Sequence, residues 1–194
     1  MFSSEIFSRL ERGAQVVLRK DAAAIIGFTG LQAGDRVVDA GAGSGFLSIS
    51  LGSVVAPTGK VFSYEWKDDF FEIARKNVSR AGLEKVVEVK YEDVLEGIAE
   101  KDIDLVTLDL ANSDKALAHA FAALKPKGYC VGILPNVEQA KRFTLEAEKL
   151  GFASCLTTEI IERRWLVREE GCRPETTGVL HTAFLTFARK PGQA

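Results

Sequence analysis

Residues 35–46 read DRVVDAGAGSGF, and the rest of the chain can be placed around this stretch. It opens with a short run of β-forming residues, breaks at Gly41, Gly43 and Gly45, and continues as the apolar pattern of a helix. A strand, a glycine turn and a helix form a backbone cradle, because glycine lacks the Cβ atom that would keep a ligand away and the first helical turn has unpaired N–H groups. The spacing G-x-G-x-G differs from the dinucleotide fingerprint G-x-G-x-x-G, so an ordinary strand–helix turn is the alternative interpretation of this stretch alone.

The composition favours one folded domain. The 194 residues are 46% hydrophobic and 9% aromatic, which is enough to bury a substantial core. There is no apolar run near the roughly 20 residues of a membrane span and no signal-peptide pattern at the start, so we expect a cytoplasmic protein without a membrane partner. Cys130, Cys155 and Cys172 are odd in number and widely spaced, which suits neither a disulfide framework nor a metal site. A net charge of −2 argues against a uniformly basic nucleic-acid binder but leaves room for a local basic patch.

Predicted strands and helices alternate along most of the chain. Residues 1–20 form an N-terminal arm in which basic residues outweigh acidic ones, and residues 21–194 form one domain. Asp21 is placed to cap a helix over residues 22–28, and Asn136 to cap the last helix. The period of the apolar residues predicts strands near 36–38, 60–64, 86–89, 102–110 and 129–134, helices over 46–56, 68–81, 113–124 and 137–150, and a turn at 125–128.

The C-terminal part predicts a change of topology. Residues 152–167 and 178–188 are extended, and a charged loop at 168–177 separates them. Since no helix lies between them, these two strands should pair antiparallel. The predicted fold class is therefore α/β, a Rossmann-like seven-stranded sheet that is mostly parallel, carries an antiparallel C-terminal strand pair and is flanked by helices.

Acidic residues follow several predicted strands. Asp39 ends the first strand, and Glu65 ends the second about 20 residues beyond the glycines, where an α/β nucleotide site commonly binds a ribose diol. Asp93 follows the third strand and is placed to accept from an adenine amino group, with Val94 against the ring. Asp109 ends the most apolar strand of the chain. A helix cap for Glu65, and a cap or a salt bridge for Asp109, are the structural alternatives.

Three further stretches carry a family resemblance. They are residues 20–30 (KDAAAIIGFTG), 61–69 (VFSYEWKDD) and 181–190 (HTAFLTFARK). With the glycine turn, they make the chain resemble the class I S-adenosylmethionine-dependent methyltransferases, and more narrowly the tRNA (adenine-N1)-methyltransferase family that modifies T-loop adenosine 58. The resemblance extends nearly end to end from about Gln15.

The resemblance implies roles for particular residues, with S-adenosylmethionine as the cofactor and no metal. Glu65 would hold the ribose hydroxyls, and Asp93 with Val94 the adenine. The methionine and ribose would be lined by Gly41, Gly43, Ser44, Gly45 and Phe46. Asp39 and Asp109 would lie near the positive sulfonium. Asp109 would be the catalytic residue, which accepts a hydrogen bond from the exocyclic amine of the target base, because adenine N1 already has a lone pair and no general base is needed.

Two departures from the family pattern keep other functions open. Only a short arm precedes Lys20-Asp21, where members usually carry a small β-rich domain, and residues 111–114 (ANSD) stand where members have a proline and then a Pro-Trp pair. A tRNA methyltransferase, a small-molecule methyltransferase such as those of corrinoid precursors, and a non-catalytic cofactor-binding subunit are the three hypotheses. For tRNA as partner, residues placed to contact phosphates are Arg163, Arg164, Arg168 and Arg173, which otherwise form a solvated strand edge.

The C-terminal pair also predicts self-association. Apolar residues occupy both faces of its second strand, and the last helices of so short a chain are not expected to cover both. They are Val179, Ala183, Leu185 and Phe187 on one face, and Leu180 and Phe184 on the other. The resembled family is tetrameric, so we expect a homo-oligomer, with a tetramer as the implied size.

Overall fold

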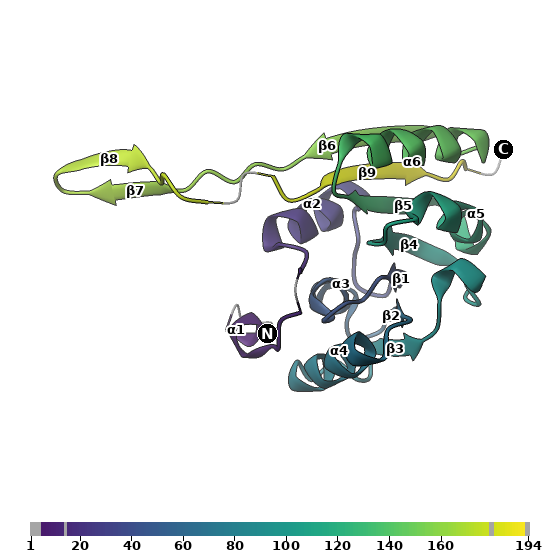
Figure 1. The fold of residues 1–194 in the computed structure, drawn as a ribbon. Coiled ribbons are helices and arrows are strands. Elements are labelled where there is room, and N and C mark those ends of the chain that lie inside the picture. Colours follow the sequence, from purple (N-terminus) through teal and green to yellow (C-terminus); the bar gives the residue numbers. More distant parts are fainter. Residues whose placement is uncertain (1–4, 14, 179–180, 193–194) are drawn as a thin grey trace.

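The computed structural model describes residues 5–13, 15–178 and 181–192, and its centre is a seven-stranded sheet in the order β3-β2-β1-β4-β5-β9-β6 (Figure 1). The sheet strands are β1 (Arg36–Ala40), β2 (Lys60–Glu65), β3 (Val87–Tyr91), β4 (Ile103–Leu108), β5 (Leu124–Leu134), β6 (Ser154–Glu159) and β9 (Phe184–Arg189). Neighbours from β3 to β5 pair in parallel, whereas β9 is antiparallel to both β5 and β6. The predicted α/β fold with an antiparallel C-terminal pair is confirmed.

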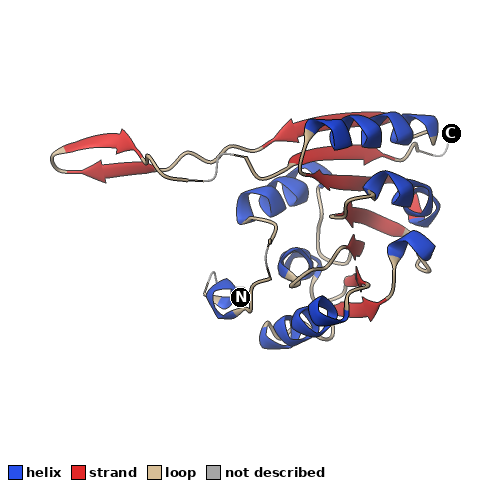
Figure 2. Cartoon of the chain, in the orientation of Figure 1, coloured by secondary structure: helices blue, strands red, loops and turns tan. Residues whose placement is uncertain are grey.

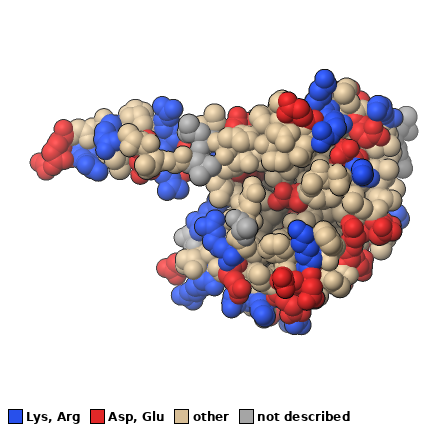
Figure 3. Space-filling model, in the orientation of Figure 1, with Lys and Arg blue, Asp and Glu red and all other residues tan. Residues whose placement is uncertain are grey.

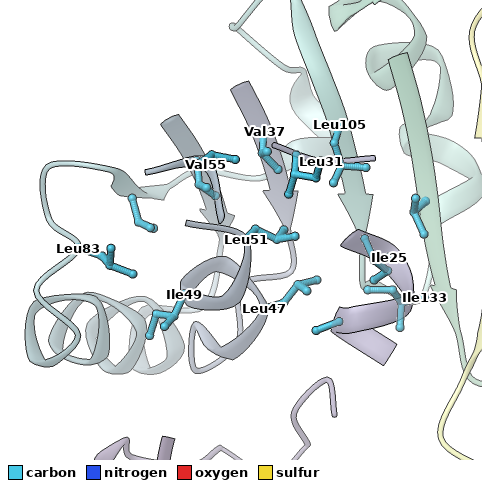
Figure 4. Close-up of a cluster of buried hydrophobic side chains, with 14 of the residues drawn as sticks. Ile25, Leu31, Val37, Leu47, Ile49, Leu51, Val55, Leu83, Leu105 and Ile133 are labelled. Carbon is cyan, nitrogen blue, oxygen red and sulfur yellow. The ribbon is translucent and has the colours of Figure 1, made fainter. Parts of the chain in front are cut away.

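Helices cover both faces of this sheet (Figures 1 and 2). On one face lie α2 (Arg19–Thr29), α3 (Phe46–Val55) and α4 (Asp68–Arg80), and on the other α5 (Ser113–Ala123) and α6 (Val137–Lys149), with the 3₁₀ turn η1 (Val94–Glu96). Figure 4 shows the first of the two resulting cores, in which Ile25 of α2 and Leu47 of α3 meet Leu105 of β4. None of the helices formed by the described residues is long and apolar enough to cross a membrane.

Three predicted boundaries need correction. Helix α2 begins at Arg19, and Asp21 does not cap it: Asp21 lies inside the first turn, is 1% exposed, and accepts hydrogen bonds from Lys20 Nζ at 2.8 Å and Thr182 Oγ1 at 2.8 Å. The third strand ends at Tyr91, two residues later than predicted. The predicted turn at 125–128 is an irregular start of β5, in which Lys127 takes a φ of +68°. The cap at Asn136 is confirmed, because its side chain accepts from Gln139 N at 2.9 Å.

The predicted charged loop at 168–177 is wrong. Strand β7 (Trp165–Arg168) and strand β8 (Gly171–Pro174) pair antiparallel in a sheet of their own, and the long first strand predicted for 152–167 breaks after Glu159. Figures 1 and 2 show this β7–β8 hairpin projecting well away from the body. The stretch predicted as one strand over residues 152–167 therefore leaves the main sheet after β6 and forms the first strand of the β7–β8 hairpin.

The apolar surface predicted on the last strand is also displaced. Ala183, Leu185 and Phe187 are buried, and the Phe187 ring lies 5.0 Å from the Phe28 ring of α2. On the other face, the partly buried Phe184 packs against the core that α6 covers. Val179 and Leu180 lie outside the described residues. Both faces of β9 are thus covered. Exposed apolar side chains lie elsewhere, among them two on the hairpin, where Trp165 is 57% and Val167 77% exposed.

Candidate active site

The glycine turn lies between the carboxyl ends of β1 and β4, where the strand order of the sheet reverses and ligands of open α/β sheets bind. Gly41 has a φ of +86°, and a Cβ there would lie 2.2 Å from the backbone oxygen of Asp109, so this glycine lets the two strand ends approach. Gly43 has a φ of +53°, and an added Cβ would have only the Gly41 oxygen, at 4.0 Å, within that distance. Gly43 is therefore the glycine that leaves backbone open to a ligand.

Glu65, the last residue of β2, holds the turn in place. Its Oε2 accepts from Gly43 N at 2.9 Å, and its Oε1 accepts from Trp66 N and Lys67 N, each at 3.0 Å. The side chain is 5% exposed. The predicted position beside the glycines is correct. The two latter bonds fix the chain just before α4, but Glu65 does not cap this helix, because neither donor lies in its first turn. A carboxylate has about four acceptor sites, so one remains for a ligand hydroxyl.

Asp39 lies under the turn and is 1% exposed. Its Oδ2 accepts from Ser48 Oγ of α3 at 2.5 Å, and its Oδ1 accepts from Thr107 Oγ1 of β4 at 2.6 Å. Burial raises the pKa of this carboxyl, while the two hydroxyl donors oppose that shift. Since Asp39 is buried and both its oxygens accept from neighbouring hydroxyls, it can act on the site only through its charge and through the packing of α3 on the sheet.

Asp109 follows β4 directly and is the least constrained acid of the site. Its backbone N–H donates to Ala40 O at 2.9 Å, and the residue is exposed to solvent although protein atoms crowd its carboxyl. Loss of water around the carboxyl, followed by the negative charges of Asp39 and Glu65, raises the pKa of Asp109 to about 7. Within the described part of the chain, no lysine, arginine or histidine forms an ion pair with these three acids.

Asp93 and Val94 lie further out along the same edge, just after β3. Asp93 Oδ1 accepts from Leu95 N at 2.9 Å and caps η1, and its second oxygen forms no hydrogen bond to a described side chain or backbone group. Val94 is 4% exposed and packs in the core with Tyr64, so its side chain offers little surface to a ligand. The segment after η1 is fixed to the sheet through Glu100, because Tyr64 donates to Glu100 and Lys90 Nζ lies 2.9 Å from Glu100 Oε1.

The N-terminal arm closes one side of the glycine turn. Gly13 N donates to Ser44 Oγ at 3.1 Å, and the Phe7 ring lies 5.6 Å from the Phe46 ring. Asn77 of α4, fully buried, exchanges two bonds with Glu11, 2.9 and 2.8 Å long, and donates to Ser44 O at 2.8 Å. The side chains of Ser44 and Phe46 therefore contact this arm. Figure 3 shows the hollow beside the arm, with acidic side chains within it.

A glycine turn with acids on successive strand ends is common to many nucleotide-binding sites. Comparison with known proteins shows to which family this chain belongs. A family model described as "tRNA methyltransferase complex GCD14 subunit" matches residues 4–173. The chain belongs to this GCD14 family. A curated relative is the "tRNA (adenine(57)-N(1)/adenine(58)-N(1))-methyltransferase TrmI" of Methanocaldococcus jannaschii. The chain is 36% identical to it over 213 aligned residues, which cover 96% of this chain and 76% of the relative.

Solved structures agree with this membership of the GCD14 family. The chain is similar to an S-adenosylmethionine-dependent O-methyltransferase of Thermotoga maritima, with a TM-score of 0.92 and 31% identity over 99% of this chain and 73% of that one. It is also similar to the tRNA (m1A58) methyltransferase TrmI of Aquifex aeolicus, with a TM-score of 0.89 and 26% identity over 100% of this chain and 77% of that one.

The GCD14 family and the methyltransferase fold imply S-adenosylmethionine, and the residues of the site fit it. Asp39, Glu65 and Asp109 form a cluster of acids that no basic side chain of the described residues neutralises, and the cofactor brings a sulfonium and an ammonium. Gly43 leaves an open backbone, as a cofactor lying along the turn requires. The structure brings the glycine turn, Glu65, Asp39 and Asp109 together and places Asp93 at the outer end of the same edge.

Several residues that shape this GCD14 site were not found by sequence reasoning. Asn77 looks like a polar interruption in the apolar face of α4, and Thr107 like a weak polar residue in a buried strand. Two stretches of the sequence did indicate such a contact. The stretches at 20–30 and 181–190 were singled out separately, and the structure joins them, because Lys20 Nζ lies 2.6 Å from Thr182 Oγ1.

Proposed function

We propose that this member of the GCD14 family transfers a methyl group from S-adenosylmethionine to N1 of an adenine in tRNA, with the T-loop adenosine 58 as target. Family membership and the 36% identity to an enzyme named for adenine 57 and 58 support the reaction class. The observation that carries the proposal is the position of Asp109 at the switch point of the sheet, where its carboxyl forms no ion pair with a described residue and has a pKa raised to about 7.

Each residue of the site has its own role in the proposed reaction. When bound, S-adenosylmethionine supplies an electrophilic methyl group on a positively charged sulfur. The turn at Gly43 and the remaining acceptor site of Glu65 hold the ribose end, and the free oxygen of Asp93 accepts from the adenine amine. Asp109 accepts from the exocyclic amine of the target base and offsets the positive charge that N1 acquires, so its effect lies in positioning and electrostatics.

The assay uses purified protein, labelled S-adenosylmethionine and a tRNA transcript with adenine at position 58. Label should enter this transcript and yield 1-methyladenosine on nucleoside analysis, whereas a transcript with guanine at that position should remain unlabelled. Equal labelling of both transcripts would remove position 58 as the target. Absence of label in either tRNA, together with label in a small-metabolite extract, would contradict RNA as the substrate.

We also propose that the protein is a homo-oligomer, with a tetramer as the expected size, and that the apolar face of the β7–β8 hairpin is where the copies meet. The cross-strand pairs Trp165–Pro174 and Val167–Cys172 share one face of the hairpin. An isolated two-stranded hairpin is at best marginally stable in water, so a covered face is needed. Its charges, Arg168 and Arg173 against Glu169 and Glu170, balance, which suits an identical surface as the partner.

A further inference from the structure

The base of the β7–β8 hairpin lies on the ligand edge of the sheet. Strand β6 runs in the same direction as β5, because each is antiparallel to β9, so β6 ends at the edge where β4 ends before Asp109. The chain then leaves the sheet toward the hairpin. At this base, residues 162–164 and 174–178 enclose, with Leu18 and Lys20, a hollow of about 500 Å³ that the cofactor site does not use.

The base is firmly anchored to the body. Lys20 Nζ contacts Asp21 Oδ1 at 2.8 Å and Ile160 O at 2.6 Å, and its side chain is only 7% exposed. His181 ring nitrogens lie 2.6 Å from Glu159 Oε1 and 3.0 Å from Pro135 O. These contacts join the two chains of the base to α2 and to the end of β5. The hollow is therefore set at a defined place beside the active site.

Arginines give this hollow its chemistry. Arg163 and Arg164 both line it and are both exposed. Arg164 Nε lies 2.9 Å from Glu162 Oε1, while Arg163 forms no ion pair with any described residue. Two acids, Glu162 and Glu175, also line the hollow. The ammonium of Lys20 is matched by Asp21 in a buried pair, whereas the Arg164–Glu162 pair is exposed to solvent, so the two guanidinium groups remain open to a ligand. Their planar donors suit the oxygens of a phosphodiester.

A second basic group lies on the N-terminal arm. Arg9 and Arg12 are exposed there, on the segment that Gly13 and Asn77 tie to the glycine turn. Figure 3 shows basic side chains on the hairpin and on the N-terminal segment, on either side of the opening between them. Basic side chains thus lie on both segments beside this gap, among acidic ones, although the whole chain has a net charge of −2.

We propose that the hollow at the hairpin base, through Arg163 and Arg164, and the N-terminal arm, through Arg9 and Arg12, hold the RNA backbone on the two sides of the target nucleotide. The proposal rests on the RNA methyl transfer proposed above. A base turned outward into a pocket needs its flanking phosphates held, since the enzyme must offset the lost stacking and pairing. Each arginine supplies a phosphate contact that carries no sequence information.

The test measures tRNA binding by fluorescence anisotropy over a range of salt concentrations, with the whole protein. Two double variants, Arg163→Gln/Arg164→Gln and Arg9→Gln/Arg12→Gln, are compared with Lys141→Gln/Arg142→Gln, an exposed basic pair on α6. Each of the first two should bind tRNA about tenfold or more weakly, with a salt slope smaller by about 1.4 to 1.8 because two phosphate contacts are lost. The α6 variant should behave like the wild type, and all three should keep the S-adenosylhomocysteine affinity and melting temperature.

The outcomes separate this inference from the function on which it rests. If the wild type methylates tRNA but both double variants keep its affinity and salt slope, the proposed contacts are wrong and the function stands. The same holds if the α6 variant loses as much affinity as the others, because binding would then follow total charge. If the wild type neither binds nor methylates tRNA, the proposed function fails and this inference fails with it.

Discussion

At the scale of single residues, the acids of the site predict a pH dependence. Asp109 has a pKa raised to about 7, so in the cofactor-free protein it holds a proton below that pH. A cationic ligand favours the ionised carboxyl. Affinity for S-adenosylmethionine should therefore increase between about pH 6 and about pH 8, and binding near pH 7 should release a proton. Titration calorimetry in two buffers with different ionisation enthalpies measures both effects.

Asp109→Asn is the matched control, because it keeps the shape of the side chain and removes the titration. The variant should show a flat affinity over the same pH range. The sign for stability is opposite to that for binding: a carboxyl whose native pKa lies above the unfolded value of about 3.9 makes the native state hold more protons between about pH 4 and 7, so it lowers the free energy of unfolding as pH increases. A pH dependence of binding that survives in Asp109→Asn would assign the effect to another group.

At the scale of elements, the N-terminal arm and α4 are joined through one side chain. Asn77 makes three hydrogen bonds that link Glu11 of the arm to the turn at Ser44. Asn77→Ala should lower the free energy of unfolding by about 2–3 kcal/mol, because buried backbone groups lose their partners. It should also weaken S-adenosylhomocysteine binding, since the arm and the turn lose their common anchor. Urea denaturation and calorimetry measure the two effects.

The control for this variant is Asn112→Ala. Asn112 precedes α5 and is exposed, and its side chain makes no capping hydrogen bond. Removing it should change the free energy of unfolding by less than about 0.5 kcal/mol. Equal effects of the two substitutions would show that Asn77 is not an anchor between the arm and α4.

At the scale of the whole molecule, the β7–β8 hairpin is the proposed contact between copies. Val167→Glu places a charge in the centre of the proposed contact, where it would lose water without gaining a partner. Light scattering at micromolar concentration should give a multiple of the single-chain mass for the wild type and a lower mass for this variant, with S-adenosylhomocysteine binding kept. Val137→Glu, at another exposed valine, on α6, should leave the assembly intact. A monomeric wild type would contradict the proposal.

The sequence predicted the helices and strands correctly where the apolar residues form a long regular pattern. The run from Ile103 to Leu108 is buried on both faces of the sheet, as its continuous apolar pattern predicts, and the acids after β2, β3 and β4 share one edge as parallel strands require. The hairpin was missed because each of its strands is only four residues long and its turn is formed by charged residues. The role of Asp21 was missed because its partner Thr182 is 161 residues away and only the fold brings the two together.

The most direct test of the central claim is single-turnover methyl transfer to the tRNA by Asp109→Ala, with the cofactor saturating. Asp109 is proposed to position the base and offset its charge in the transition state, so the rate should fall by about 10²-fold or more while the fold is retained and S-adenosylhomocysteine still binds. A purely structural Asp109 would instead cost about 1 kcal/mol of stability and leave the rate nearly unchanged. A rate close to that of the wild type would contradict the account of the active site given by the structure.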